Sequence, residues 1–372
     1  MTTPPPAEIG APLEAVDTPA LILELDAFER NLERMRTALS GSGVAVRPHA
    51  KSHKCAVIAL QQVAHGAVGV CCQKVGEAEA MVQGGVRDVF VSNEIVARSK
   101  LVRLAALARQ ARIAVAADDA ENVASLEEAA ADFGVTLDVL VEVKVMPLRC
   151  GAEPGEAVVR LARQIADRPH LRFAGLHAYH GTAQHLPSWQ ERRQAVKEAA
   201  DKVAMTRELL DRAGLECGII TGAGTGTYRY EAASGVYNEV QPGSYVFMDV
   251  DYGRIGGEDS ESFTEFEHSL FVWTQVMGGN GADHAVVDAG TKSMTTEKGM
   301  PWVHGRKDVA YTRASDEHGE LEVAGAGLRR GDKLLLIPPH CDPTVNLHDW
   351  YVGVRSNRVE ALWPITARGA IR

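Results

Sequence analysis

The densest group of reactive side chains is the octet Arg47-Pro48-His49-Ala50-Lys51-Ser52-His53-Lys54. It follows a short strand signal at 44–46, so it is predicted to lie at the carboxyl end of a strand. In a barrel the loops after the strands build the active site, and a lysine there becomes a nucleophile when burial or neighbouring cations lower its pKa. The cationic neighbours are His49, His53, Lys54 and Arg47. The alternative is a basic surface loop, and the octet alone favours neither.

Polar side chains recur where later strands are predicted to end. They are Cys71-Cys72-Gln73-Lys74, Ser92-Asn93-Glu94, Glu142 with Arg149, and the group His177, Tyr179, His180 and His185. Polar residues often end strands merely to satisfy backbone groups, so each group alone is a weak signal. Their recurrence at one strand end after another favours a single shared site.

A glycine-rich run, Thr221-Gly222-Ala223-Gly224-Thr225-Gly226-Thr227, directly follows another predicted strand. Small residues let backbone N–H groups approach an anion, and the threonine hydroxyls add donors. The run lacks the Lys-Ser/Thr ending of a nucleotide P-loop and comes too late for an N-terminal dinucleotide fingerprint. A phosphate monoester at a late barrel loop fits it better, and a purely structural turn is the alternative.

His340 and Asp342 lie two residues apart after a predicted strand at 334–337. On an extended chain the two side chains point to the same side. One imidazole and one carboxylate, completed by water, suit Mn²⁺ or Mg²⁺ better than structural zinc. The alternative is an ordinary turn at a strand end, which the pair alone favours.

Alternating strand and helix patterns run through the first two thirds of the chain. Helices are predicted at 27–39, 75–83, 100–110, 120–133, 156–166 and 188–213, with Asp26 as the N-cap of the first. A weaker pair of elements reaching 246–248 completes about eight units, which predict an α/β fold with a TIM-type (β/α)8 barrel, or alternatively an open doubly wound sheet. Later strand patterns separated by turns predict a mostly β C-terminal domain. We expect a barrel at 26–265 and a β domain at 266–372, joined by the N-terminal segment 1–25.

Composition narrows the classes of partner. The 372 residues carry a net charge of −10, which disfavours nucleic acid and anionic membranes. No apolar run approaches the roughly 20 residues that span a bilayer, and the N-terminus lacks the basic start of a signal peptide. Six cysteines without a C-x-x-C pair indicate neither a disulfide framework nor structural zinc. A cytoplasmic protein with a small-molecule substrate is therefore expected.

These motifs resemble, in their order along nearly the whole chain, the D-threonine aldolase/D-serine dehydratase family. Its members are pyridoxal 5′-phosphate enzymes of the alanine racemase fold (fold type III). The resemblance is carried by Asp17-Thr18-Pro19, Pro48-His49-Ala50-Lys51, Arg149-Cys150-Gly151, Ala178-Tyr179-His180-Gly181, Gln241-Pro242-Gly243-Ser244-Tyr245 and Ala367-Arg368-Gly369.

The resemblance implies a role for each candidate site residue. Lys51 is the Schiff-base lysine, Arg149 faces the ring oxygen of the cofactor, and Tyr179 lies beside the ring. The phosphate is held by one loop with Gly222, Gly224, Thr225 and Gly226 and by a second with Gly243, Ser244 and Tyr245. His340 and Asp342 hold a divalent metal, with His185 as the candidate general base. Dehydratases of the family have His-x-Cys with zinc, so Asp342 favours the aldolase branch.

The reaction implied is retro-aldol cleavage of D-β-hydroxy-α-amino acids, as of D-threonine to glycine and acetaldehyde. The ending His348-Asp349-Trp350-Tyr351 also resembles β-hydroxyaspartate aldolases, which join glycine and glyoxylate. A D-serine or 3-hydroxyaspartate dehydratase is a further alternative. A non-catalytic cofactor carrier, which is a single barrel, and a cofactor-free barrel are the remaining ones.

The family also implies a head-to-tail homodimer in which the β domain of one chain covers the barrel mouth of the other. Two features depart from the family pattern. Ala223 replaces a glycine of the phosphate loop, and the stretch 144–148 before Arg149 lacks the usual acidic, glycine-containing loop.

Overall fold

The structure is a computed structural model that describes residues 3–280, 283–325 and 327–372. The chain divides into two compact units. The first, the β unit, comprises Met1–Met35, Ser52–Cys55 and Ser244–Gly369. The second, the barrel unit, comprises Arg36–Lys51, Ala56–Gly243 and Ala370–Arg372. The sequence-based boundary between residues 265 and 266 stays a prediction.

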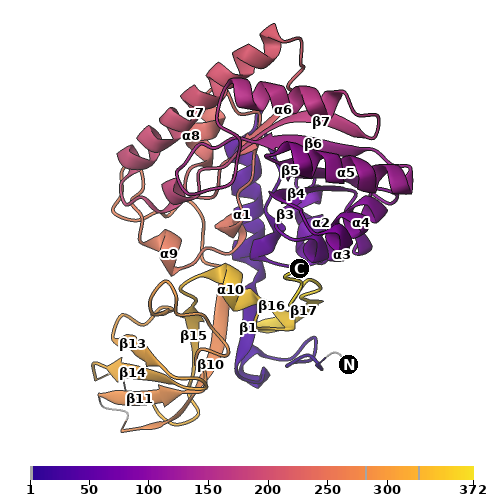
Figure 1. Ribbon diagram of the computed structural model, residues 1–372. Helices are drawn as coiled ribbons and strands as arrows, with labels where there is room; N and C mark the ends of the chain where they lie inside the picture. The colour runs from indigo at the N-terminus through magenta and orange to yellow at the C-terminus, as the bar shows by residue number, and fades with distance from the viewer. Residues whose placement is uncertain (1–2, 281–282, 326) are drawn as a thin grey trace. The chain divides into compact units, whose positions relative to one another are not determined.

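The barrel unit contains eight parallel strands in the order β2-β9-β8-β7-β6-β5-β4-β3, of which Figure 1 labels β3 to β7. The two end strands are connected by a hydrogen bond from Val68 N to Val46 O (2.9 Å) and by a parallel bridge between His49 and Cys71. The sheet therefore closes on itself, so the predicted barrel is confirmed and the open-sheet alternative is wrong. The strands are β2 (Ala45–Val46), β3 (Val70–Cys72), β4 (Asp88–Glu94), β5 (Arg112–Ala117), β6 (Leu137–Glu142), β7 (Leu171–Ala178), β8 (Ile219–Gly222) and β9 (Glu239–Val240).

Helices connect successive strands, and local sequence sets their ends. In α7 the Ser188 hydroxyl accepts a hydrogen bond from Glu191 N (3.2 Å), while Glu191 accepts one from Ser188 N (3.0 Å), a reciprocal cap. Helix α5 begins after the N-cap Asp119 and ends at Gly134, whose φ of 60° suits glycine. The helices are α2 (Ala56–Ala64), α3 (Val75–Gln83), α4 (Arg98–Leu107), α5 (Ala120–Phe133), α6 (Glu156–Ala166), α7 (Trp189–Arg212) and α8 (Tyr228–Ala233).

Small and apolar side chains on alternate strand positions fill the inside of the barrel. They are Cys71, Phe90, Ala114, Ala116, Leu140 and Ala174, which form one buried cluster. Because all eight strands are parallel, their carboxyl ends meet at one end of the barrel. The polar residues that follow the strands are therefore gathered at that end.

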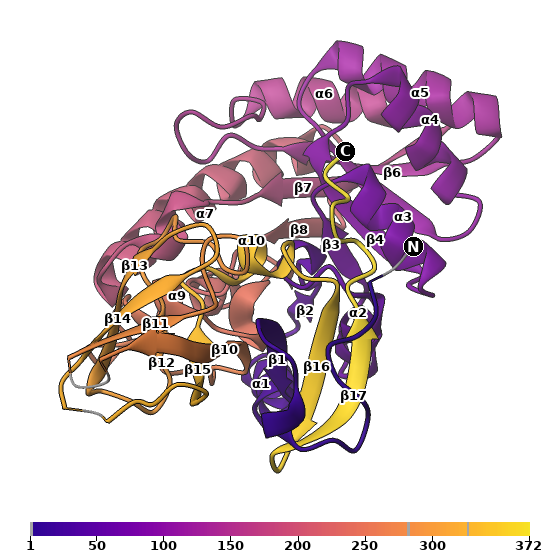
Figure 2. The same cartoon turned by 90° about the horizontal axis from the view of Figure 1, so that it is seen from below.

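The β unit is built on a nine-stranded sheet. Strand β1 lies at its centre, antiparallel to β10 and parallel to β16, and Figure 2 shows it beside β16. Helix α1 (Leu25–Ala38) follows β1 directly. The strands are β1 (Ala20–Glu24), β10 (Leu270–Gly279), β11 (His284–Val287), β12 (Trp302–Val303), β13 (Val309–Ala314), β14 (Gly319–Val323), β15 (Lys333–Ile337), β16 (Trp350–Arg355) and β17 (Arg358–Pro364).

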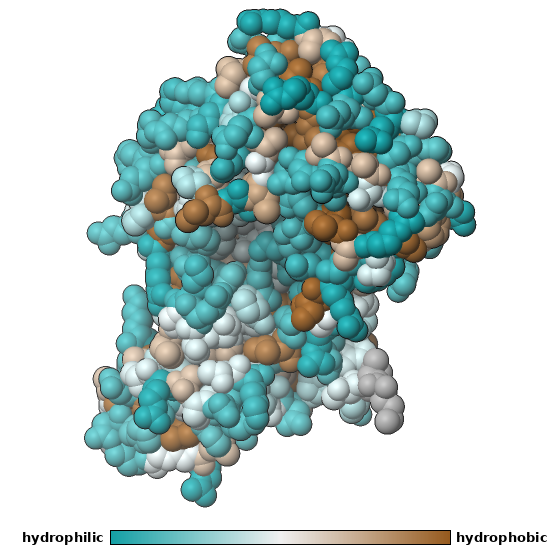
Figure 3. Space-filling view, in the orientation of Figure 1, coloured by the Kyte–Doolittle hydropathy of each residue, from teal (hydrophilic) through white to brown (hydrophobic). Residues whose placement is uncertain are grey.

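Apolar residues of the central strands form the core of this unit, and hydrophilic residues dominate the molecular face in Figure 3. The core cluster includes Ile22, Phe271, Trp273, Ile337, Val352 and Val359. Among the described residues, no helix combines the length and the apolar character needed to cross a membrane.

Two local predictions are wrong. Asp26 does not cap α1, because the helix begins at Leu25 and the side chain of Glu24 accepts the hydrogen bond from Ala27 N (2.6 Å). The eighth barrel strand is β9, whereas Val246 belongs to a 3-10 helix, Ser244–Val246. Two residues are too few for a strand period to be visible in the sequence.

Candidate active site

Lys51 lies in a short 3-10 helix, Ala50–Ser52, after β2. Its position is set by His49, whose Nδ1 accepts a hydrogen bond from Lys51 N (3.4 Å). The other ring nitrogen, Nε2, contacts Gln73 Oε1 (3.3 Å) and Ser92 Oγ (3.2 Å), at the ends of β3 and β4. His49 therefore ties the lysine-bearing turn to the two neighbouring strands.

Arg47, expected among the cations near the lysine, instead forms a buried ion pair. Its side chain contacts Glu239 Oε1 (3.0 Å) and Asp88 Oδ1 (2.5 Å). Burial lowers the pKa of Arg47, but the two carboxylates raise it overall. The guanidinium therefore stays protonated, and the carboxylates balance its positive charge. His53 and Lys54 belong to the β unit, where their carbonyls accept hydrogen bonds from Tyr351 and Ala367.

The ends of β6 and β7 carry a second charged group. Glu142, which is 1% exposed, accepts a hydrogen bond from Arg149 Nε (2.9 Å) and contacts Nδ1 of His177. The guanidinium of Arg149 lies 5.2 Å from the ring centroid of Tyr179, a cation–π contact. Burial lowers the pKa of Arg149 and Glu142 raises it, with a net increase. Glu142 thus fixes a charged arginine beside the tyrosine.

His177 Nε2 is buried and, within the described residues, has no hydrogen-bond partner. Since Nδ1 is held by Glu142, Nε2 is the atom left for a bound molecule or water. His180 is half-buried, and burial lowers its imidazole pKa. His185, the predicted base, is exposed at the end of the 3-10 helix Thr182–His185.

A cluster of two carboxylates and one cysteine lies near Arg149, and it includes Asp118, which was not singled out from the sequence. One ligand atom each from Glu94, Asp118 and Cys150 lies within 4.8 Å of the others. Burial and the nearby Glu142 raise the pKa of Glu94. Asp118 accepts a hydrogen bond from Gly151 N (2.9 Å) and thereby holds the loop behind Arg149. Asp118 follows β5 directly, as the polar residues of the other strand ends do.

The glycine-rich loop after β8 has little room for side chains. A Cβ on Gly222 would lie 2.3 Å from Ala178 O, and one on Gly224 would lie 2.5 Å from Gln184 Oε1. Ala223 has a φ of 66°, a left-handed conformation that normally favours glycine. Thr225 is 1% exposed, and its hydroxyl has no hydrogen-bond partner among the described residues. A close-packed backbone with an unused buried donor fits a bound phosphate monoester.

The second predicted phosphate loop is 241–245, and its Gly243 is the last residue of this segment of the barrel unit. Just before it, Pro242 O accepts a hydrogen bond from His49 N (3.1 Å) and connects the loop to the lysine turn. Ser244 and Tyr245 are buried in the β unit, where the Tyr245 ring contacts Phe266 with centroids 5.6 Å apart.

The predicted metal ligands lie in the β unit at the start of α10 (Cys341–Val345). His340 Nε2 and Asp342 Oδ1 are 4.0 Å apart, a separation that one ion with bonds of about 2.1 Å to each atom can span after a small adjustment. Nδ1 of His340 contacts Glu297, which sequence reasoning missed. A carboxylate on the far nitrogen directs the near one toward a metal, as in carboxylate–histidine–metal triads.

Neighbouring groups hold this turn. Asp249, fully buried, accepts hydrogen bonds from Cys341 N (3.0 Å) and Tyr252 N (3.0 Å), and burial raises its pKa. The Cys341 thiol contacts Asp342 Oδ1 (3.3 Å), and burial raises its pKa well above the usual value. The cysteine is therefore a buried neighbour of the carboxylate. The predicted donor set is one nitrogen from His340 and one oxygen from Asp342.

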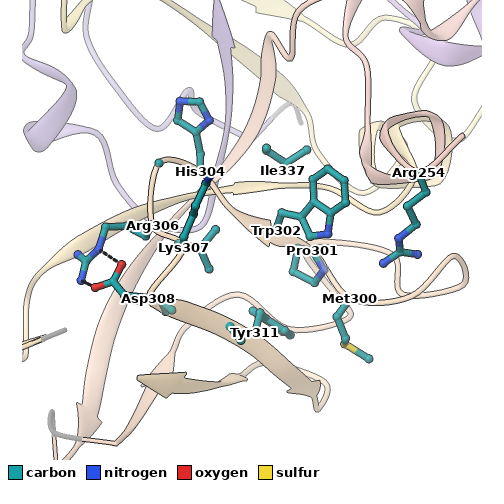
Figure 4. Close-up of a pocket in the computed structure, with 14 residues that line it drawn as sticks. Arg254, Met300, Pro301, Trp302, His304, Arg306, Lys307, Asp308, Tyr311 and Ile337 are labelled. Atoms are coloured by element: carbon teal, nitrogen blue, oxygen red, sulfur yellow. Dashed lines mark hydrogen bonds and ion pairs between the residues drawn. The ribbon is translucent and has the colours of Figure 1, made fainter. Parts of the chain in front are cut away.

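A cavity of about 950 Å³ lies elsewhere in the β unit, against β12, β13 and β15 (Figure 4). Trp302 and Met300 give it an apolar wall, and Arg254 lies at its edge. No predicted site residue lines it. The volume of this cavity is therefore no evidence that the active site lies there.

Comparisons with known proteins agree with this arrangement. Residues 23–251 match the family profile "Alanine racemase, N-terminal domain", and residues 269–354 match "Putative serine dehydratase domain". The chain is 45% identical over 368 residues to a 3-hydroxy-D-aspartate aldolase of Paracoccus denitrificans, covering 98% of this chain and 95% of the relative. It is 46% identical over 371 residues to a D-threonine aldolase of an Arthrobacter species, and the match covers 99% of this chain and 97% of that relative.

The crystal structure of D-threonine aldolase from Filomicrobium marinum superimposes with a TM-score of 0.96 at 48% identity, and all of both chains is covered. The chain belongs to the alanine racemase-fold family, and within it to the lyases that include D-threonine aldolase and 3-hydroxy-D-aspartate aldolase. The predicted family, fold and enzyme class are thus confirmed.

Proposed function

We propose that this lyase cleaves the Cα–Cβ bond of D-β-hydroxy-α-amino acids, as of D-threonine to glycine and acetaldehyde. Pyridoxal 5′-phosphate and a divalent metal, Mn²⁺ or Mg²⁺, are its cofactors. The observation that carries this assignment is the pair of His340 Nε2 and Asp342 Oδ1, 4.0 Å apart, with Glu297 on the far side of the imidazole. It provides the nitrogen–oxygen donor set expected of the aldolase branch, and the relatives named above are aldolases.

The barrel residues bind and orient the cofactor. Lys51 would bind the aldehyde carbon of the cofactor covalently, and His49 holds the lysine turn against β3 and β4. Arg149 would donate to the ring oxygen of the bound cofactor, and Glu142 holds its guanidinium beside Tyr179. Once bound, pyridoxal phosphate acts as an electron sink for the broken Cα–Cβ bond, while the metal polarises the β-oxygen.

The phosphate is assigned to the loop with Gly222, Gly224, Thr225 and Gly226, together with Gly243, Ser244 and Tyr245. The buried Thr225 hydroxyl supports this assignment, because it needs an acceptor. The Gly226 N–H already donates to Gln184 Oε1 (3.1 Å), so this residue acts mainly through the shape of the loop.

His185 is assigned as the general base that removes the proton of the β-hydroxyl. Its side chain is exposed and can exchange protons with water. Bond cleavage leaves an electron pair at Cα and forms the aldehyde carbonyl, and Cα then takes up a proton to give glycine. Each substrate therefore yields one glycine and one aldehyde.

The nearest alternative keeps the mechanism and changes the side chain: 3-hydroxy-D-aspartate would give glycine and glyoxylate. A relative at 45% identity is a 3-hydroxy-D-aspartate aldolase, so D-threonine and 3-hydroxy-D-aspartate are the two alternative substrates to be compared. A dehydratase would instead eliminate water, giving pyruvate from D-serine or oxaloacetate from 3-hydroxyaspartate. The position that holds Cys in the dehydratases is Asp342 here, which argues against a thiolate–zinc site of that kind.

One experiment separates these reactions. Purified protein with pyridoxal phosphate and Mn²⁺ is incubated separately with D-threonine, D-3-hydroxyaspartate and D-serine, and the carbonyl product is identified. Acetaldehyde or glyoxylate together with glycine supports the aldolase assignment and names the substrate. Pyruvate or oxaloacetate with ammonia, and no glycine, would overturn it.

Three assignments concern the whole protein: a barrel domain at 26–265 with a β domain at 266–372, a cytoplasmic location, and a head-to-tail homodimer. We propose the dimer from the family resemblance, which implies that the β domain of one subunit covers the barrel mouth of the other. Light scattering at assay concentration tests it, and a fully active monomer would contradict it.

A further inference from the structure

A chain of buried polar side chains lies behind the glycine-rich loop. Gln184 Oε1 accepts a hydrogen bond from Gly226 N (3.1 Å), and Gln184 Nε2 donates to Thr227 Oγ1 (2.7 Å). Thr227 Oγ1 in turn donates to Glu231 Oε1 (2.9 Å). The three side chains are 0%, 1% and 2% exposed, so each of these bonds is made away from water.

The Gly226 N–H requires an acceptor and so fixes the orientation of the Gln184 amide, and the other bond directions are consistent with it. Because the threonine hydroxyl has one proton and gives it to Glu231, it accepts from Gln184, which therefore turns its oxygen toward the loop. That oxygen is also the atom that a Cβ on Gly224 would approach to 2.5 Å. The backbone at Gly224 and Gly226 therefore packs against the side-chain amide of Gln184 in one orientation only.

A buried cation supports the same loop from α7. Arg192, which is 0% exposed, donates from Nε to Gly226 O (3.1 Å) and from Nη1 to Leu186 O (2.8 Å). Both polar groups of the Gly226 peptide region are therefore bound by buried side chains, its N–H by Gln184 and its carbonyl by Arg192. Helices α7 and α8, which carry Arg192 and Glu231, pack against each other (Figure 1).

Glu231 has no salt bridge among the described residues, and its Oε2 atom has no hydrogen-bond partner there. An ionised carboxylate without a cation at this depth is strongly disfavoured. Burial accordingly raises the pKa of Glu231 to about 8. A neutral acid also avoids placing a negative charge one helical turn from a loop that binds an anion.

We propose that Gln184, Thr227 and Glu231 are positioning residues that hold the glycine-rich loop in its phosphate-binding shape, and that Glu231 does so as a neutral acid. This inference rests on the proposed assignment of the loop to the cofactor phosphate. None of the three is a catalytic residue, because each acts through the backbone of the loop.

The test compares two ligands that differ only in the phosphate. The full-length protein is freed of cofactor, and the dissociation constants of pyridoxal 5′-phosphate and of pyridoxal are measured by absorption titration. Both ligands carry the aldehyde that reacts with Lys51, so the change in their affinity ratio between wild type and a variant isolates the phosphate contribution. Four variants are compared with wild type: Thr227→Val, Gln184→Leu, Glu231→Leu and Glu231→Gln.

Thr227→Val, Gln184→Leu and Glu231→Leu are each expected to lower the preference for the phosphorylated ligand by about 10-fold, the scale of one buried hydrogen bond. Pyridoxal affinity should change by less than about 2-fold. Glu231→Gln keeps a neutral acceptor for Thr227 and should retain the wild-type preference. The matched control is Gln194→Leu, which removes an exposed α7 glutamine that bonds to Glu198 and should change neither affinity.

The possible failures can be told apart. If Glu231→Gln loses the preference as Glu231→Leu does, an ionised carboxylate is required and the neutral-acid inference is wrong. If the three disruptive variants keep the wild-type ratio, or lower both affinities equally, the residues do not position the phosphate loop. If wild type binds both ligands equally, the phosphate assignment itself fails.

Discussion

His340 presents one ring nitrogen to Asp342 and the other to Glu297. The Nε2 atom lies 4.0 Å from Asp342 Oδ1, while Nδ1 contacts the Glu297 carboxylate. The three side chains have different roles, because His340 and Asp342 can bind a metal and Glu297 orients the imidazole. Replacing Asp342 and replacing Glu297 should therefore have different effects.

Asp342→Ala is expected to abolish aldehyde release while leaving cofactor binding intact. The metal stabilises charge on the β-oxygen as the carbon–carbon bond breaks, and losing it should cost several kcal/mol, on the order of 10³-fold or more in kcat. The measurements are aldehyde release and the visible absorption of the bound cofactor. Added Mn²⁺ should restore chelated wild type but not the variant. Full activity of wild type shown by elemental analysis to be metal-free would remove the metal from the mechanism.

Glu297→Gln should weaken metal binding without abolishing catalysis. Loss of such an orienting carboxylate typically costs about 10- to 100-fold in metal affinity or activity. Activity titrated with Mn²⁺ should show a raised half-saturating concentration and a nearly normal plateau. Glu317→Gln, which removes an exposed glutamate paired with Lys292, is the control. A normal half-saturation in Glu297→Gln would mean that this contact does not orient the ligand.

Lys51→Ala should lose the visible absorption band of the covalently bound cofactor. The reason is that no other amine is expected at the same position on the strand end. Borohydride reduction of wild type followed by peptide mapping should locate the cofactor on Lys51. Labelling at Lys54 or Lys74 instead, with the band surviving in Lys51→Ala, would show that the assignment is wrong.

Arg47→Met should destabilise the barrel unit by about 3–5 kcal/mol, because it leaves the buried carboxylate of Glu239 without its cation. Asp88 is partly exposed and keeps Arg112 at 3.3 Å. Urea unfolding measures the change. The control is Arg98→Met, since Arg98 pairs with Asp132 at an exposed site and should contribute within about 0.5 kcal/mol. A similarly small effect for Arg47→Met would show that the carboxylates are solvated or protonated at little cost.

Glu231→Gln should change how stability depends on pH. The folded-state pKa of Glu231 is raised from 4.5 to about 8, so between these values the unfolded carboxyl is ionised while the folded one keeps its proton. The unfolded state then binds fewer protons, and wild-type stability falls as pH rises through this window. The variant lacks this penalty, and its free energy of unfolding relative to wild type should rise by about 1.4 kcal/mol per pH unit at most. A difference that stays constant from pH 5 to pH 8 would contradict a protonated Glu231.

Long periodic elements could be predicted from the sequence, and isolated contacts could not. The α3 and α5 helices have their predicted limits, because apolar spacing and capping residues are local signals. The strands β9 and β12 have two residues each and leave no period to read. Both are positioned by their neighbours in the sheet rather than by their own sequence.

The candidate site shows the same limit. Lys51 and the His340/Asp342 pair are visible as clusters along the chain, whereas Glu297 reaches His340 from 43 residues away. Arg47 was expected near the lysine from its position in the octet, but its side chain pairs with Asp88 and Glu239. Sequence proximity predicts which backbone segments meet, and it does not predict which direction a long side chain takes.

The central place of β1 in its sheet has a consequence for the order of folding during synthesis. Leu21 pairs with Val272 on one side and with Tyr351 on the other, so the middle of the β unit needs both ends of the chain. The strands of the barrel unit, from Ala45 to Val240, can pair while later residues are still being made. Until Trp350–Arg355 leaves the ribosome, however, β1 exposes an apolar edge, which is the kind of surface that chaperones protect and that aggregates when it stays open.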